Sequence, residues 1–314
     1  MTRLKRLRAG SRLAVVSPAS IPKGPLVQLG MQRLRDLGYQ PVLMPSALAK
    51  GPLNYAGTAD ARAADLHAAF ADPAYDGILC TRGGWGAAEL LPLLDTDLIR
   101  ANPKPFLGFS DMTTLHLLLA QVCGVHSFYA PMVAPDFARG DTLAHGVDLY
   151  SWRSALEQAE PWHLDAAQGM RVLKAAPDVE GTLIGGCLTL LTESLSTPWA
   201  MQPPPGDLVL FLEEVGTAAY QWDRMLLHLR YAGLLERVRG IVFGDMEQCC
   251  TGDGHAELIE ETLRYNLRDF AGPVSIGLLS GHVNAANVAL PLGVRVRLSC
   301  TSAASLHFLE SAVE

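Results

Sequence analysis

Residues 106–122 read FLGFSDMTTLHLLLAQV, and they give the clearest indication of the fold class. The apolar run 106–109 predicts a buried strand, and the apolar spacing over 112–122 predicts a helix. Ser110 and Asp111 lie between the two, on a tight strand-to-helix turn. A strand that leads directly into a helix is the repeating unit of an α/β domain with a parallel sheet.

The same alternation continues on both sides of this stretch. Apolar runs bounded by turn residues predict further strands, and helical spacing with terminal glycines predicts further helices. Strands followed by helices up to about residue 130 predict βα crossovers and a mainly parallel sheet. The predicted strands are 12–17, 41–44 and 77–80, and the predicted helices are 26–38, 58–70 and 87–94.

The pattern degrades after residue 135, where polar, proline- and tryptophan-containing stretches appear. We expect an N-terminal domain over 1–160, a linker over 161–178 and a C-terminal domain over 179–314. Within the last of these, periodicity predicts a helix at 222–233 and a set of strands. Those strands are 181–184, 207–212, 240–243, 274–279 and 294–298.

The composition is typical of a globular protein, and the net negative charge does not favour binding to polyanions. Of the 314 residues, 49% are hydrophobic and 18% are charged, and the formal net charge is −7. We therefore expect no nucleic-acid partner. No apolar run approaches the roughly 18 residues of a membrane span, and the run 13–16 is too short for a signal peptide. These features predict a cytoplasmic protein without a membrane partner.

The cysteines and histidines predict neither a disulfide framework nor a metal site. The six cysteines form no C-x-x-C pair, and the histidines lack H-x-x-x-H spacing. The chain also lacks the G-x-G-x-x-G and P-loop patterns that cradle phosphates. We expect reduced cysteines, no metal and no cofactor, which argues against a nucleotide-dependent enzyme.

Ser110 is the candidate nucleophile. A serine on a tight strand-to-helix turn projects its hydroxyl outward, and the N–H of Asp111 at the helix N-terminus can face a developing oxyanion. The turn resembles a nucleophile elbow, although Met112 stands where G-x-S-x-G has its second glycine. The structural alternative is that Ser110 and Asp111 only cap the helix.

Two further polar groups follow predicted strands. Glu213 and Glu214 end the run 207–212, and His282 follows the run 274–279 after a short loop. Strand alternation places the two glutamates on opposite faces, so only one of them can orient a histidine. Since ligands bind at the carboxyl ends of strands in open α/β sheets, these groups fit a base and its carboxylate. Alternatively, the acids merely end a strand and the histidine caps a loop.

A glycine-rich loop, 82–86 (RGGWG), follows the predicted strand 77–80. Glycines at this density let a backbone approach a ligand closely. The spacing matches no nucleotide-binding motif, so a phosphate cradle and an oxyanion-hole donor both stay open.

Together these motifs resemble the LD-carboxypeptidase family of serine peptidases, which includes muramoyltetrapeptide carboxypeptidases and microcin C self-immunity peptidases. The resemblance covers almost the whole chain and rests on the order of the motifs. They are 13–20 (LAVVSPAS), 56–58 (AGT), 62–70 (RAADLHAAF), 82–86 (RGGWG), 108–111 (GFSD), 210–216 (LFLEEVG), 223–226 (DRML), 281–282 (GH) and 290–293 (LPLG).

The resemblance implies an α/β protein with two domains. The N-terminal domain would be doubly wound around a mainly parallel sheet and carry the nucleophile, and the smaller, β-rich α/β domain would carry the other two catalytic residues. It implies that Ser110 attacks the scissile carbonyl and that His282 takes the proton and returns it to the leaving amine. Glu213 would hold the imidazole, with Glu214 as the alternative.

The resemblance also implies an oxyanion hole. The N–H of Asp111 would supply one donor, and the glycine loop would supply the other, from Gly84 in preference to Gly83.

The family's substrate is a murein tetrapeptide, cut at the L,D amide bond before its terminal D-alanine during cytoplasmic recycling of the cell wall. The free carboxylate of such a peptide would suit Arg82, and Trp85 is a second candidate for substrate binding. The family commonly forms dimers, so the resemblance also implies a homodimer.

Two departures from the family pattern concern the shape of the pocket. Cys187 stands where the family commonly has the asparagine of G-G-N, and Val283 stands where a glycine usually follows the histidine.

Two alternatives to a murein tetrapeptide carboxypeptidase remain. One is a microcin C immunity-type enzyme that cleaves an aminoacyl- or peptidyl-nucleotide amide, whose base would stack on Trp85, Trp199 or Trp222. The other is a two-domain protein that binds a ligand without turnover.

Overall fold

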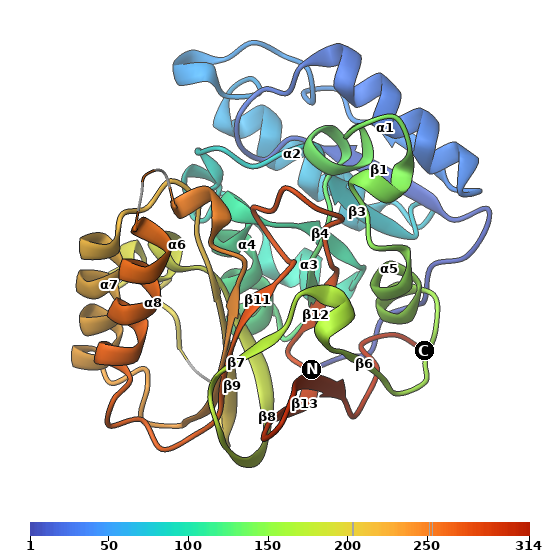
Figure 1. Ribbon diagram of the computed structural model, residues 1–314. Coiled ribbons are helices and arrows are strands. Elements are labelled where there is room, and N and C mark those ends of the chain that lie inside the picture. Colours follow the sequence, from blue (N-terminus) through green and yellow to red (C-terminus); the bar gives the residue numbers. More distant parts are fainter. Residues whose placement is uncertain (203, 251, 253) are drawn as a thin grey trace. The chain divides into compact units, whose positions relative to one another are not determined.

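The structure is a computed structural model that describes residues 1–202, 204–250, 252 and 254–314 (Figure 1). The chain divides into two units. Unit 1 comprises residues 1–159, 285–291 and 311–314, and unit 2 comprises residues 160–284 and 292–310. The chain thus re-enters unit 1 after residue 284, which the predicted division into consecutive segments does not include.

Unit 1 is built on one six-stranded sheet with the order β12-β5-β4-β3-β1-β2. The pairs β1–β2, β1–β3, β3–β4 and β4–β5 are all parallel. The strands are β1 (Arg12–Val16), β2 (Gln40–Leu43), β3 (Gly77–Cys80), β4 (Phe106–Gly108), β5 (Ser127–Tyr129) and β12 (Leu290–Leu292). The α-helices are α1 (Gly24–Asp36), α2 (Ala59–Ala71), α3 (Thr96–Ala101), α4 (Thr113–Leu118) and α5 (Leu149–Leu156).

The strand order of unit 1 makes it doubly wound, as expected. The chain moves from β1 to β2 on one side of β1, and then to β3 and β4 on the other side. The switch in direction lies between β1 and β3, and ligands of such sheets bind outside the carboxyl ends of the strands at this point. The loops 17–20 and 81–86 and the turn at Ser110 all leave the sheet at that edge.

Unit 2 contains an eight-stranded mixed sheet with the order β6-β14-β13-β8-β9-β10-β11-β7. The central strands β8 to β11 are parallel, and the outer strands pair antiparallel. The strands are β6 (Trp162–Leu164), β7 (Arg171–Lys174), β8 (Ala176–Cys187), β9 (Leu208–Glu213), β10 (Val238–Gly244), β11 (Val274–Leu278), β13 (Arg295–Cys300) and β14 (Ala304–Phe308). The α-helices are α6 (Leu188–Glu193), α7 (Ala219–Tyr231) and α8 (His255–Asn266), of which α7 and α8 run side by side (Figure 1).

Three predicted elements differ from the structure. The stretch 161–178, expected as a linker, forms β6, β7 and the beginning of β8. The predicted helix 87–94 is only a short 3-10 turn, η2 (Ala87–Leu90), because Pro92 cannot continue a helix. The predicted helix 112–122 is α4 followed by one π-helical turn, η4 (Leu119–Cys123), which ends at Gly124 with φ of 68°.

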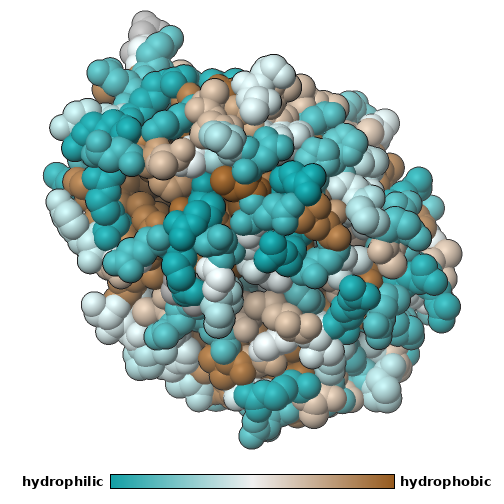
Figure 2. Space-filling view, turned by 90° about the horizontal axis from the view of Figure 1, so that it is seen from below, coloured by the Kyte–Doolittle hydropathy of each residue, from teal (hydrophilic) through white to brown (hydrophobic). Residues whose placement is uncertain are grey.

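Across the described residues, none of the helices combines the length and the apolar character needed to traverse a lipid bilayer. On the face that Figure 2 shows, hydrophobic residues form patches separated by hydrophilic ones.

Candidate functional site

Ser110 occupies a strained backbone position. Strand β4 ends at Gly108, Phe109 is still extended, and Ser110 then adopts a left-handed φ of 66° before the chain enters the 3-10 turn η3 (Ser110–Met112) and α4. A left-handed conformation costs energy for any residue with a Cβ, so it persists only where the surroundings enforce it. A strained serine between a strand and a helix is the geometry of a nucleophile elbow.

The glycine loop lies directly against this serine. A Cβ placed on Gly83 would come within 2.8 Å of Ser110 Cβ and 3.0 Å of Ser110 Oγ. A Cβ on Gly84, whose φ is +110°, would come within 2.3 Å of Ser20 Oγ. Any side chain at either glycine would therefore displace a neighbouring serine. That Gly84 supplies an oxyanion donor stays a prediction.

Buried polar side chains fasten the loops around Ser110. A carboxylate oxygen of Asp111 accepts a hydrogen bond from the N–H of Ala87 at 2.8 Å, which ties the serine turn to the end of the glycine loop. The buried guanidinium of Arg62 donates to Pro18 O at 2.6 Å and to Gly86 O at 2.8 Å. Arg62 therefore links the loop after β1 to the loop after β3. This role of Arg62 could not be predicted from the sequence, because nothing in the pattern of α2 marks an inward-facing arginine.

The two residues predicted to contact substrate, Arg82 and Trp85, belong to the same glycine loop. Arg82 is half-buried and its Nε donates to Gly83 O at 3.2 Å, and its guanidinium has no acidic partner in the described part of the chain. Trp85 is 53% exposed, and its N–H donates to Ser20 Oγ at 3.3 Å. Unit 1 therefore carries a cationic group and an exposed aromatic ring on the same loop whose Gly83 lies against the strained serine.

A buried histidine supports the end of β4. His116 on α4 contacts Gly108 O through Nε2 and Ser127 Oγ through Nδ1, both at 2.8 Å. Burial lowers the pKa of His116 to about 4, so the ring is neutral near pH 7. A carbonyl oxygen can only accept, so Nε2 carries the hydrogen and Nδ1 accepts from the hydroxyl of Ser127. His116 thus fixes the strand two residues before Ser110.

In unit 2, the structure brings His282 and Glu213 together. Nδ1 of His282 lies 2.8 Å from Glu213 Oε2, and the backbone N–H of His282 donates to the same oxygen at 2.9 Å. The Glu213 side chain is fully buried, and that of His282 is 17% exposed. A carboxylate that accepts from Nδ1–H leaves the lone pair at Nε2, which is the arrangement of a base with its orienting acid.

Close backbone approach makes this pairing possible. A Cβ on Gly281 would lie 2.4 Å from Glu213 Oε2, and a Cβ on Gly244 would lie 2.7 Å from Glu213 Cβ. Glycine at the end of β10 and glycine in the loop after β11 therefore leave the space that the Glu213 side chain occupies.

Glu214 is engaged elsewhere, on the opposite side of β9. One carboxylate oxygen accepts from the thiol of Cys187 at 2.9 Å and from the N–H of Thr189 at 2.8 Å. The other accepts from the Thr217 hydroxyl at 2.6 Å. Burial raises the pKa of the Cys187 thiol well above its usual range, so it stays protonated and donates. Glu214 therefore joins the start of α6 to the turn after β9.

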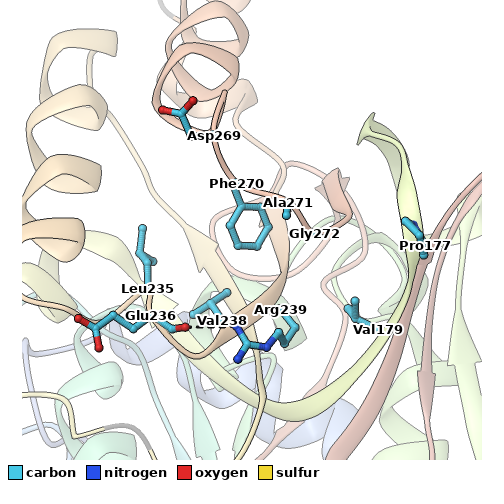
Figure 3. Close-up of a pocket in the computed structure, with 10 residues that line it drawn as sticks. All are labelled: Pro177, Val179, Leu235, Glu236, Val238, Arg239, Asp269, Phe270, Ala271 and Gly272. Carbon is cyan, nitrogen blue, oxygen red and sulfur yellow. Dashed lines mark hydrogen bonds between the residues drawn. The ribbon is translucent and has the colours of Figure 1, made fainter.

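A pocket of about 460 Å³ in unit 2 lies apart from these groups. The residues around it, including Leu235, Val238 and Phe270, lie at the amino ends of β10 and β11, and Phe270 points into it (Figure 3). Glu213 lies at the opposite, carboxyl end of neighbouring β9, roughly 20 Å along a strand of this length. Arg239, the cation of this pocket, is already paired with Asp207 at 2.9 Å. Among the described residues, no group of three or more potential metal ligands occurs.

The two halves of the chain match the two domains of one protein family. Residues 13–130 match the LD-carboxypeptidase N-terminal domain, and residues 180–298 match the LD-carboxypeptidase C-terminal domain. A probable murein peptide carboxypeptidase of Bacillus subtilis is 32% identical over 94% of this chain and 91% of that protein.

Two solved structures are similar over nearly the full length. The muramoyltetrapeptide carboxypeptidase of Oxalobacter formigenes has a TM-score of 0.83 at 28% identity and covers 96% of this chain and 99% of its own. An MccF-like protein of Bacillus anthracis has a TM-score of 0.87 at 25% identity and covers 99% of this chain and 100% of its own.

The neutral state of His116 predicts a pH dependence of stability. Its pKa is about 4 in the folded chain against an ordinary 6.5, so the unfolded chain binds more protons between these values. The free energy of unfolding is therefore unaffected by this histidine above pH 6.5. It falls by about 3 kcal/mol as the pH falls towards 4, because the unfolded chain takes up the proton first. Lowering the pH from about 7.5 to 4.5 should therefore reduce the urea midpoint of the wild type more than that of His116→Gln. Parallel pH profiles for the two proteins would contradict this account of the ring.

Proposed function

Because the chain belongs to the LD-carboxypeptidase family, we propose that it hydrolyses the L,D amide bond before the terminal D-alanine of murein tetrapeptides. The enzyme is a serine-type carboxypeptidase, as its relatives are. The observation that carries the proposal for this chain is the strained φ of 66° at Ser110, with the glycine loop against its hydroxyl. A helix cap needs no such conformation, because cap residues ordinarily have extended backbone.

We propose that Ser110, His282 and Glu213 form the catalytic triad. Ser110 Oγ attacks the carbonyl of the diamino acid, and its proton passes to His282 Nε2. Glu213 holds the imidazole through Nδ1 and stabilises the imidazolium that forms. The N–H groups of Asp111 and Gly84 bind the oxyanion.

Collapse of the tetrahedral intermediate breaks the C–N bond, and His282 gives its proton to the amine of the leaving D-alanine. Water then attacks the Ser110 ester with His282 as base, and the tripeptide leaves with a new carboxylate.

The charges of unit 1 support this choice of substrate. A carboxypeptidase must bind a free carboxylate beside the scissile bond, and Arg82 is a cation of the glycine loop with no acidic partner in the described residues. We propose that Arg82 binds the carboxylate of the terminal D-alanine and that Trp85 covers an apolar part of the peptide. We further propose, on the family resemblance alone, that the enzyme acts in the cytoplasm, in the recycling of cell-wall peptides, as a homodimer.

A second candidate function is hydrolysis of an aminoacyl- or peptidyl-nucleotide amide. The observations that favour it are the similarity to the MccF-like protein and the exposure of Trp85, whose ring could stack on a base. Trp222 is fully buried and cannot take that role, and Trp199 is only partly exposed. A two-domain protein that binds such ligands without turnover is the remaining alternative.

Release of D-alanine from a murein tetrapeptide tests the proposal. We expect turnover by the wild type, and a loss of about three to six orders of magnitude in both Ser110→Ala and His282→Ala, since the members of a triad act as a unit. The measurement is the rate of D-alanine release, and substrate binding is measured separately by calorimetry.

Three outcomes separate the alternatives. Turnover that survives in Ser110→Ala would rule out Ser110 as nucleophile. Hydrolysis of an aminoacyl-nucleotide amide in place of the tetrapeptide would establish the second candidate. Binding of either ligand by the wild type with no hydrolysis would establish the binding protein.

The two adjacent glutamates provide a matched pair of variants. Glu213→Gln should lower kcat by about three to four orders of magnitude, because the amide no longer fixes the productive imidazole tautomer. Glu214→Gln should lower the free energy of unfolding by about 1–3 kcal/mol, because it upsets buried hydrogen bonds, and should change kcat far less. Activity assays and urea unfolding of both variants check this, and the reverse pattern would assign the orienting role to Glu214.

A further inference from the structure

The backbone N–H of Ser110 is bound by a side chain from the neighbouring strand. It donates to the phenol oxygen of Tyr129 at an N···O distance of 3.1 Å. Tyr129 ends β5, where it pairs in register with Gly108 of β4. The hydrogen bond therefore reaches from β5 across the end of β4 to the strained residue itself.

The phenol is held rigidly in this place. Tyr129 is fully buried, and its ring lies 6.1 Å from the ring of Phe109 and 5.8 Å from that of His116, centroid to centroid. His116 is in turn fixed by Gly108 O and by Ser127 of the same strand β5. A buried side chain between two packed rings has few alternative rotamers, so its oxygen stays where the Ser110 N–H meets it.

We propose that Tyr129 is a positioning residue for the nucleophile. Its phenol oxygen holds the peptide plane between the extended Phe109 and Ser110, from which the left-handed backbone of Ser110 begins. It thereby selects the conformation that presents Oγ beside Gly83. By taking this N–H, Tyr129 also leaves oxyanion binding to the donors of Asp111 and the glycine loop. This inference rests on the proposed role of Ser110 as nucleophile.

Removal of the Tyr129 phenol oxygen should slow the chemical step rather than weaken substrate binding. Loss of the phenol oxygen lets the backbone of Ser110 relax from its strained φ, which displaces Oγ from the attack position. A displacement of about 1 Å at a reacting atom costs on the order of a hundredfold in rate. Arg82, which we propose binds the peptide before reaction, belongs to the glycine loop after β3, whereas Tyr129 belongs to β5. We therefore expect kcat to fall while KM stays nearly constant.

The experiment compares Tyr129→Phe with Tyr39→Phe in the full chain. Tyr39 is a matched control, because it is another buried tyrosine of unit 1 with a hydrogen-bonded hydroxyl. That hydroxyl accepts a hydrogen bond from Trp152 Nε1 at 2.9 Å and donates one to the carboxylate of Glu157. Tyr129→Phe should lower kcat for D-alanine release by about 10- to 100-fold with KM within about twofold. Tyr39→Phe should lower the melting temperature and leave kcat unchanged.

Site-specific 3-fluorotyrosine at position 129 serves as a second variant that keeps the size of the ring. Fluorine makes the phenol oxygen a weaker acceptor, so kcat should fall by a smaller factor at unchanged KM and melting temperature. This variant decides the question if Tyr129→Phe does not fold.

Clear results overturn the inference. A Tyr129→Phe enzyme with wild-type kcat would do so, as would a rise in KM alone, or an equal loss of kcat in Tyr39→Phe. Ser110→Ala separates this failure from failure of the proposed function. If Ser110→Ala is inactive while Tyr129→Phe is fully active, only the positioning role of Tyr129 is lost. If Ser110→Ala is as active as the wild type, the nucleophile itself has been assigned wrongly.

Discussion

The left-handed backbone of Ser110 is the constraint on which the other features of unit 1 depend. A buried strand must end at Gly108 for the turn to be so tight, and Phe109 must still be extended. Glycine is required at position 83 because the hydroxyl of Ser110 occupies the space of a side chain. Asp111 then ties the turn to the glycine loop, and Arg62 ties that loop to the one after β1. Strain of this kind costs on the order of 1–3 kcal/mol, which the surrounding packing must offset.

In unit 2, two adjacent glutamates are buried where β9 ends, and each carboxylate needs hydrogen-bond donors. Alternation along β9 sends them to opposite faces, and each is satisfied by its own set of donors. Glu213 receives the backbone N–H and the imidazole of His282, whereas Glu214 receives donors from the start of α6 and the following turn. The hydrogen-bond partners thus distinguish the two residues. Glu213 is placed to orient an imidazole, whereas Glu214 connects two backbone segments. In each unit the candidate catalytic groups lie at the carboxyl ends of parallel strands, as the architecture of α/β sheets leads one to expect.

Much of this could be predicted from the sequence, because local periodicity and turn chemistry carry it. The strand, turn and helix around Ser110 were predicted together, and so was the parallel character of unit 1. The edge strands within 161–178 were missed, because short antiparallel edges with polar residues lack a continuous apolar run. The support that Tyr129 and Arg62 give to the site could not be predicted either. Their hydrogen bonds join residues 19 and 24 or more positions apart, so they depend on strand register and on loop paths that no local pattern encodes.

The proposal that Ser110 is a nucleophile activated by His282 is tested most directly by the rate at which Ser110 is covalently modified. The protein is incubated with a fluorophosphonate, and the labelled peptide is identified by mass spectrometry in the wild type and in His282→Ala. The account predicts a single adduct on Ser110 that forms at least about a hundredfold faster in the wild type, since the base removes the hydroxyl proton as the new bond forms. An adduct on another residue, or equal rates at Ser110 in the two proteins, would contradict it.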